Sequence, residues 1–196
     1  MYTVKDNLIF GFHGCDEAVC NELVNGGMSL DYSENPWDWL GKGMYFWEND
    51  PDRALLWAEN AKKYPQNKKQ KIVTPAVVGA VICLGKCLDF MEITNLQKLK
   101  SLYQDLCSKG IALPKNTGKG FYMRNLDCFL INYLVAQEKA AGNKYDSVRG
   151  VFFEGQELYT NAGFREKNHI QIAVINPNCI KGYFKVRTID SAFEEV

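Results

Sequence analysis

Two short stretches decide the fold of this chain: LIFGFHG at residues 8–14 and GKGMYF at residues 41–46. The first is an apolar run that ends in glycine, which is the pattern of a buried strand. Glycine within or beside a strand marks a place where the backbone comes close to another group. Each stretch also carries one polar side chain with a ring, His13 in the first and Tyr45 in the second. We therefore expect two strands that present a histidine and a tyrosine beside glycines.

The rest of the chain mixes helix and strand patterns. Asp16 precedes a short helical pattern, and Asp50 followed by Pro51 predicts a helix start, because aspartate caps a helix and proline suits its first position. Residues 76–84 are apolar on both faces and predict an inner strand. Further helices are expected at about 96–110 and 126–142, and further strands at 147–153, 170–175 and 182–188. This order predicts a single α+β domain over residues 1–196.

The composition is that of an ordinary globular protein. Of its 196 residues, 46% are hydrophobic and 23% charged, and the formal net charge is zero. A neutral chain lacks the overall positive electrostatic field of non-specific nucleic-acid binders. The lysine-rich run at residues 62–71 is expected to be a solvated loop.

The 7 cysteines form no CxxC pair, which favours reduced thiols in the cytoplasm. Neither histidine has metal-ligand spacing, and no segment predicts a signal peptide or a membrane span.

Six strings follow one another along the chain: GFHG at 11–14, LGKGMYF at 40–46, VGAVICLG at 78–85, SVRG at 147–150, NHIQIAVI at 168–175 and IKGYF at 180–184. In this order they resemble the ADP-ribosyltransferases of the poly(ADP-ribose) polymerase and diphtheria-toxin type. The resemblance implies a split β-sheet, made of two small packed sheets with helices. The two helices between about residues 94 and 142 have no counterpart in that pattern, so they are expected to form an insertion.

This resemblance implies that NAD is a substrate, whose ADP-ribose is transferred with release of nicotinamide and without a metal. His13 would hydrogen-bond the adenosine ribose, because an imidazole can both donate and accept. The backbone of Gly14 would bind the nicotinamide carboxamide, where a side chain would block the approach. Tyr45 would stack on the nicotinamide ring. Stacking requires the ring of Tyr45 and not its hydroxyl.

Gln171 occupies the position of the family's catalytic glutamate. A glutamine can orient the nicotinamide ribose, but it has no charge to stabilise an oxocarbenium-like centre and no basicity to activate an acceptor. Three interpretations stay open. Gln171 serves as it stands; Glu154 or Glu157, at the end of the preceding strand, supplies a carboxylate; or the chain binds NAD without turning it over.

Residues around these positions allow more than one interpretation. Trp57, on the helix after the second string, either gives nicotinamide a second aromatic face or packs as a core tryptophan. His169 shares a strand face with Gln171 by the alternation of side chains along a strand. This histidine either flanks the site or simply lies on the strand surface, and we expect it on the surface. The other tryptophans of the region either shape the mouth of the NAD site or an acceptor platform, or pack in the core, and core positions are expected for all three: Trp37, Trp39 and Trp47.

The functional hypothesis is an NAD-dependent ADP-ribosyltransferase acting on a macromolecule, similar to bacterial toxin or phage-defence effectors in the cytoplasm. Such effectors usually have a neutralising protein partner, an antitoxin. A protein side chain, a DNA base, an RNA base and a small molecule all remain open as acceptors. The alternative is an inactive transferase fold that binds NAD, ADP-ribose or a protein. A cysteine hydrolase is a third hypothesis, although no flanking sequence marks any cysteine as a nucleophile.

Overall fold

Strands and helices follow one another along the chain in nearly the order that the sequence predicts. The computed structural model describes residues 5–65, 71–188 and 190–193. In this part of the chain the elements are β1 (Lys5–Asp16), α1 (Glu17–Val24), β2 (Met44–Glu48), α2 (Pro51–Lys63), β3 (Pro75–Gly85), β4 (Cys87–Asp89), α3 (Ile93–Ser108), η1 (Lys119–Phe121), α4 (Asn125–Ala140), β5 (Ser147–Phe152), β6 (His169–Val174), η2 (Pro177–Cys179) and β7 (Ile180–Lys185). The α+β class is confirmed. The short strand β4 was not expected from the sequence.

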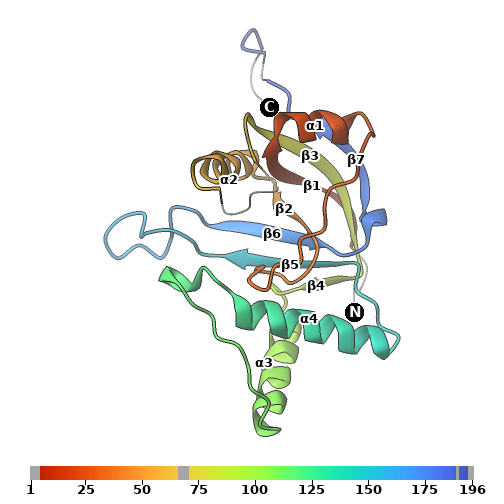
Figure 1. Ribbon diagram of the computed structural model, residues 1–196, viewed down its shortest axis with the longest axis vertical. Helices are drawn as coiled ribbons and strands as arrows, with labels where there is room; N and C mark the ends of the chain where they lie inside the picture. The colour runs from red at the N-terminus through yellow and green to blue at the C-terminus, as the bar shows by residue number, and fades with distance from the viewer. Residues whose placement is uncertain (1–4, 66–70, 189, 194–196) are drawn as a thin grey trace.

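The seven strands form one mixed sheet in the order β4-β5-β6-β2-β1-β3-β7. The pair β4–β5 is parallel and the other neighbours are antiparallel. Strands β1 and β2 share the pairs Gly11–Glu48 and Phe12–Trp47, and a hydrogen bond of 3.0 Å from the Asn49 backbone to the Phe10 carbonyl lies beside them. In contrast, β1 and β3 are paired along nearly their whole length. Figure 1 shows β5 and β6 running across the direction of β1, β3 and β7. The structure therefore has one sheet with two strongly twisted halves, and not the two separate small sheets that were expected.

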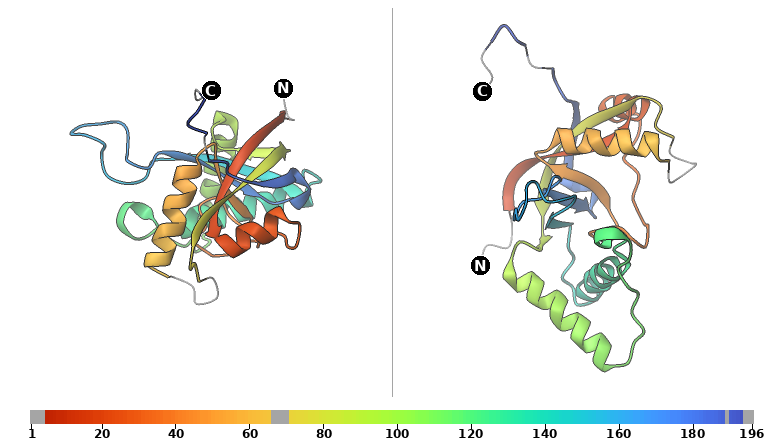
Figure 2. Two further views of the ribbon diagram at one scale, coloured as in Figure 1. Left: turned by 90° about the horizontal axis from the view of Figure 1, so that it is seen from above. Right: turned by 90° about the vertical axis from the view of Figure 1, so that its left-hand side faces the viewer.

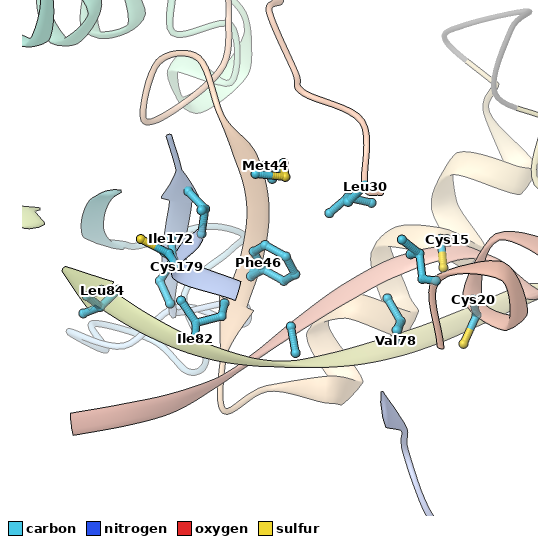
Figure 3. Packing of buried hydrophobic residues seen from close by; sticks show 13 residues of the cluster. Cys15, Cys20, Leu30, Met44, Phe46, Val78, Ile82, Leu84, Ile172 and Cys179 are labelled. Carbon is cyan, nitrogen blue, oxygen red and sulfur yellow. The ribbon is translucent and has the colours of Figure 1, made fainter. Parts of the chain in front are cut away.

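Two hydrophobic clusters lie on opposite faces of the central strands. The first packs α1 against β1, β2, β3 and β6, with Phe46, Val78, Ile82 and Ile172 fully buried at its centre (Figure 3). The second lies where α3 and α4 cover β5 and the other face of β2 and β6. Side chains alternate between the faces of a strand, so β2 contributes Phe46 to the first cluster and Tyr45 to the second.

The two helices expected between about residues 94 and 142 are α3 and α4. Figures 1 and 2 show the axes of these two helices crossing, and the helices pack on the sheet through Leu102, Leu106, Ile131 and Leu134. Helix α4 also touches the second sequence string, because the Asn132 side chain accepts a hydrogen bond of 2.9 Å from the Lys42 backbone. The insertion therefore packs against the loop before β2.

Local sequence explains where α1 and α2 begin. The Asp16 carboxylate accepts from the backbone of Ala18, and the Asp50 carboxylate accepts from the backbone of Arg53 at 2.8 Å. Pro51 is the first residue of α2, as the sequence predicts. The helix ends in exposed lysines at 62 and 63. Residues 66–70 of the lysine-rich run lie outside the described residues.

Candidate functional site

Buried polar atoms without a hydrogen-bond partner point to one region of the molecule. In the described residues, five side-chain atoms are of this kind: Trp47 Nε1, Arg53 Nε, Arg124 Nε, His169 Nε2 and Gln171 Oε1. Buried polar groups in folded proteins nearly always have a partner, so each exception requires an explanation. All five residues belong to one chain of contacts that runs from the start of α2 across β2 and β6 to the start of α4.

The centre of this region is the cross-strand pair of Trp47 and Gln171. These residues lie directly opposite each other on β2 and β6, and Gly150 lies on the other side of Gln171 on β5. Opposed residues of an antiparallel pair share one face of the sheet. Trp47 and Gln171 therefore present their polar groups on the face that carries the second hydrophobic cluster. That cluster does not extend to these two residues.

Helix α2 brings a cation and a second indole to Trp47. The Arg53 guanidinium lies 5.4 Å from the centre of the Trp47 ring, and the Trp57 ring lies 6.0 Å from it. Trp57 is 37% exposed. It therefore lies at the surface of the site and does not pack as a core tryptophan.

His13 lies where β1 and β2 diverge. Its Nδ1 is 2.8 Å from the Tyr45 carbonyl oxygen, and since a carbonyl only accepts, Nδ1 carries the proton. Burial lowers the pKa of His13, which keeps the ring neutral and leaves Nε2 as an acceptor. The ring centre lies 6.3 Å from that of Trp57. His13 is therefore connected to Gln171 through two indoles, Trp57 and Trp47.

His169 is buried, and the expectation that it lies on the strand surface is wrong. Its ring lies 5.8 Å from Trp39, which stacks on it, and 5.7 Å from Phe152, its cross-strand partner. The Arg124 guanidinium covers Trp39 at 4.4 Å. These aromatic neighbours come from the loop before β2 and from β5, which alternation along β6 alone cannot reveal. Trp47 is buried as expected, whereas Trp37 and Trp39 are only partly buried.

The two candidate carboxylates lie in different surroundings. Glu154 accepts a hydrogen bond of 2.6 Å from Arg53, and its Oε2 lies 4.0 Å from His169 Nδ1. Glu157 lies further along the β5–β6 connection, exposed and paired at 3.6 Å with Arg165. Figure 1 shows this connection extending away from the sheet. Of the two, Glu154 is the carboxylate beside the unpartnered groups.

Two residues of the sequence motifs have structural tasks that the sequence did not reveal. A Cβ atom at Gly14 would lie 2.1 Å from the Ala54 carbonyl oxygen, so glycine is required there by the packing of α2 on β1. The Tyr45 hydroxyl donates to the Gly41 carbonyl at 2.6 Å and accepts from the Leu40 backbone at 2.8 Å. Burial raises the pKa of Tyr45 well above its usual value, so this hydroxyl stays protonated. The hydroxyl fixes the loop before β2.

Other features of the described chain lie outside this region. A shallow hollow of about 500 Å³ lies between α3 and α4, among polar residues such as Gln97, Lys98 and Gln137. It holds none of the five unpartnered atoms. All seven cysteines are free thiols. Among the described residues no cluster of side chains is arranged to hold a metal, and no helix is both long and apolar enough to cross a membrane.

Three members of this region were not predicted from the sequence: the cations of Arg53 and Arg124, and the indole N–H of Trp47 as a hydrogen-bond donor. Arg53 had one available signal, because it follows the helix cap Asp50 by three positions and so lies in the first turn of α2. Arg124 had none, since it lies in the insertion and reaches the site only through the fold.

Comparison with known proteins gives one informative match. The chain is 26% identical over 199 residues to an uncharacterized protein of Methanocaldococcus jannaschii, and the match covers 91% of this chain and 89% of that protein. No family model matches the chain, and no solved structure does.

Proposed function

We propose that this protein is an NAD-dependent ADP-ribosyltransferase, which transfers ADP-ribose to a macromolecule and releases nicotinamide. One observation carries the proposal. The six strings that resemble the polymerase and diphtheria-toxin type lie on six consecutive neighbours in the sheet, β5-β6-β2-β1-β3-β7, and β4 at the edge lies outside them. Strings far apart in sequence thus lie side by side in one sheet, and the string on β6 supplies two of the five unpartnered atoms, His169 Nε2 and Gln171 Oε1.

In the proposed site, His13 binds the adenosine ribose through Nε2. Because Nδ1–H is already donated to the Tyr45 carbonyl, the remaining nitrogen accepts a hydrogen bond from a ribose hydroxyl. The Gly14 backbone holds the carboxamide, and Tyr45 with Trp57 faces the nicotinamide ring. Trp57 is the exposed member of this group.

Gln171 orients the nicotinamide ribose in this proposal. Its unpartnered Oε1 accepts a hydrogen bond from a ribose hydroxyl, which supplies the partner that the free protein lacks. The charge that stabilises the oxocarbenium-like centre then comes from Glu154, the nearest carboxylate of the two considered. Arg53 holds that carboxylate in place.

The alternative is a binding module that holds NAD or ADP-ribose without turnover. The observation that favours it is the uncharged amide of Gln171 at the position where the family has a carboxylate. Both functions fit a cytoplasmic toxin or defence effector with a neutralising protein partner, and neither involves a metal or a membrane.

Incubation of the purified protein with adenylate-labelled NAD and a cell lysate tests the proposal. Labelled macromolecules together with free nicotinamide support transfer, and separate digestion with protease, DNase and RNase assigns the acceptor class. Calorimetric binding of NAD without nicotinamide release supports the binding module. A folded protein that neither binds nor consumes NAD contradicts both functions.

A further inference from the structure

The His169 imidazole is a buried base with one free nitrogen. Its side chain has no exposed surface. Nδ1 lies 2.7 Å from the Lys167 carbonyl oxygen, so this nitrogen carries the proton and donates it to the hydrogen bond. Nε2 therefore carries a lone pair, and it has no partner among the described residues. A buried acceptor without a partner costs about 1–3 kcal/mol of stability, so its presence asks for an explanation.

The position of His169 relates it to the proposed reaction. It lies on the same face of β6 as Gln171, and the two residues are opposite Phe152 and Gly150 of β5. Trp39 stacks on the imidazole, and Arg124 covers Trp39. Both covering side chains are partly exposed, whereas the imidazole is not. Movement of this cover gives an acceptor access to Nε2 from the side of the loop before β2.

We propose that His169 Nε2 is the base that takes the proton from the acceptor during ADP-ribose transfer. This inference rests on the proposed function and adds a residue to it. Gln171 has no basicity, and the Glu154 carboxylate is engaged by Arg53 at 2.6 Å. His169 is thus a neutral base on the strand face where the reaction is proposed to occur.

The lone pair of an acceptor oxygen or nitrogen forms a bond to C1′ of the nicotinamide ribose, and the bond from C1′ to nicotinamide breaks. The electron pair of that bond stays on the ring nitrogen, so nicotinamide leaves as a neutral molecule. The acceptor proton passes to His169 Nε2, and the imidazolium later releases it to solvent.

Surrounding charges set the protonation of this imidazole. Burial lowers the pKa of His169, and Arg53 of α2 lowers it further, while Glu154 after β5 and Asp50 before α2 raise it. Arg124 adds a second cation beyond Trp39. The ring is therefore a free base at neutral pH, and Glu154, 4.0 Å from Nδ1, stabilises the imidazolium once it forms.

His169→Asn tests the inference, because the asparagine amide can still donate to the Lys167 carbonyl but cannot accept a proton. We expect the transfer rate at saturating NAD to fall by about 100-fold, the usual contribution of a general base. The dissociation constant for NAD should stay within about twofold, since Nε2 contacts the acceptor and not NAD. The wild-type rate should fall in acid only below the ordinary imidazole value of about 6.5, because burial lowers the pKa of His169. This fall should be absent in the variant, and added imidazole should restore part of the rate. His169→Gln replaces it if the asparagine variant fails to fold.

The outcomes separate the inference from the proposed function. If the wild-type protein neither binds nor consumes NAD, the proposed function fails and this inference falls with it. If the wild-type protein is active and His169→Asn keeps its rate and its acid limb, the function stands and the inference is overturned. A variant that loses NAD affinity in proportion to rate also overturns it, because His169 is then a binding residue.

Discussion

The neighbouring strands β5, β6 and β2 together carry charged or polar groups on both faces of the sheet, and the two faces are built differently. On the face of the first hydrophobic cluster, Arg149 makes two hydrogen bonds to Glu48, at 2.5 and 2.8 Å, and a third of 3.0 Å to Asp89. On the other face, Trp47 and Gln171 have buried polar atoms without partners. Trp47 and Glu48 are adjacent in sequence, yet one face satisfies its polar groups within the protein and the other does not.

We infer from this difference that the paired charged groups stabilise the fold, whereas the unpartnered groups bind a ligand. Pairing with Glu48 raises the pKa of Arg149, so this guanidinium stays charged throughout the physiological range. A paired buried cluster is disrupted when one member is removed, because its partners are left as buried charges. Removal of an unpartnered group leaves no buried charge behind. Removing it should affect binding and chemistry more than folding.

Arg149→Met tests the paired face and should have the largest effect. It leaves the nearly buried carboxylates of Glu48 and Asp89 without their cation, and we expect the free energy of unfolding to fall by about 3–5 kcal/mol. Urea denaturation measures this change. The control is Arg149→Met combined with Glu48→Gln, which should recover part of the loss because one buried charge is then absent. A single variant as stable as the wild-type protein would show that the cluster is not structural.

Gln171→Ala tests the unpartnered face. NAD-dependent activity should fall by about 100-fold, as when one positioned hydrogen-bonding group is lost from a transition state. The free energy of unfolding should change by about 1 kcal/mol or less, because no buried partner is left behind. Nicotinamide release and urea denaturation check the two expectations. If the variant loses stability but keeps its activity, Gln171 is a structural residue and the inferred difference between the two faces is wrong.

Gln171→Glu and two glutamate variants sharpen that experiment. A carboxylate at position 171 should raise hydrolysis of NAD, because it stabilises the developing positive charge and water is the easiest acceptor. Glu154→Gln should lower activity, whereas Glu157→Gln, on the exposed connection, serves as the matched control with little effect. If Glu154→Gln abolishes nicotinamide release and Gln171→Ala leaves it unchanged, the acidic role belongs to the residue after β5 alone.

Acidification should weaken the fold through the two histidines. The folded-state pKa of each is lowered by burial, so below the ordinary value of about 6.5 the unfolded chain binds protons that the folded protein does not. Stability is therefore complete above that pH and is lost as pH falls towards the folded-state pKa, by at most about 1.4 kcal/mol per pH unit for each histidine. Urea denaturation at pH 7.5 and 5.5 measures the loss (conditions chosen to span about one unit on either side of 6.5). His169→Asn should reduce the slope, and an unchanged slope would contradict the assignment of a neutral His169.

Tyr45→Phe should have the smallest effect. It removes the hydroxyl that bridges Leu40 and Gly41, and about 1 kcal/mol of stability should be lost for a hydrogen bond of this kind. NAD affinity should change little, since stacking depends on the ring. Urea denaturation and calorimetry measure the two quantities. A loss of NAD affinity as large as that of Tyr45→Ala would assign the hydroxyl to the ligand site.

Most of the helices and strands could be predicted from the sequence, because local residue patterns determine where they begin and end. Asp50 and Pro51 start α2, and the apolar residues 76–84 lie within β3. What local patterns cannot supply is the contact between distant elements. Gly14 is glycine because α2 packs on it, His169 is buried because Trp39 stacks on it, and Arg124 reaches the site from an insertion. Each of these facts depends on the sheet order, which no single strand encodes.

The narrow junction between β1 and β2 has a consequence for cooperativity. Two residue pairs join the halves of the sheet there, and beside them His13 of one half holds the Tyr45 carbonyl of the other. A molecule lodged among His13, Trp57 and Trp47 touches both halves, so its binding free energy adds to their cohesion, roughly 2.7 kcal/mol when its concentration is a hundredfold above Kd. Amide hydrogen exchange should then be slower in both halves of the bound protein than in the free one.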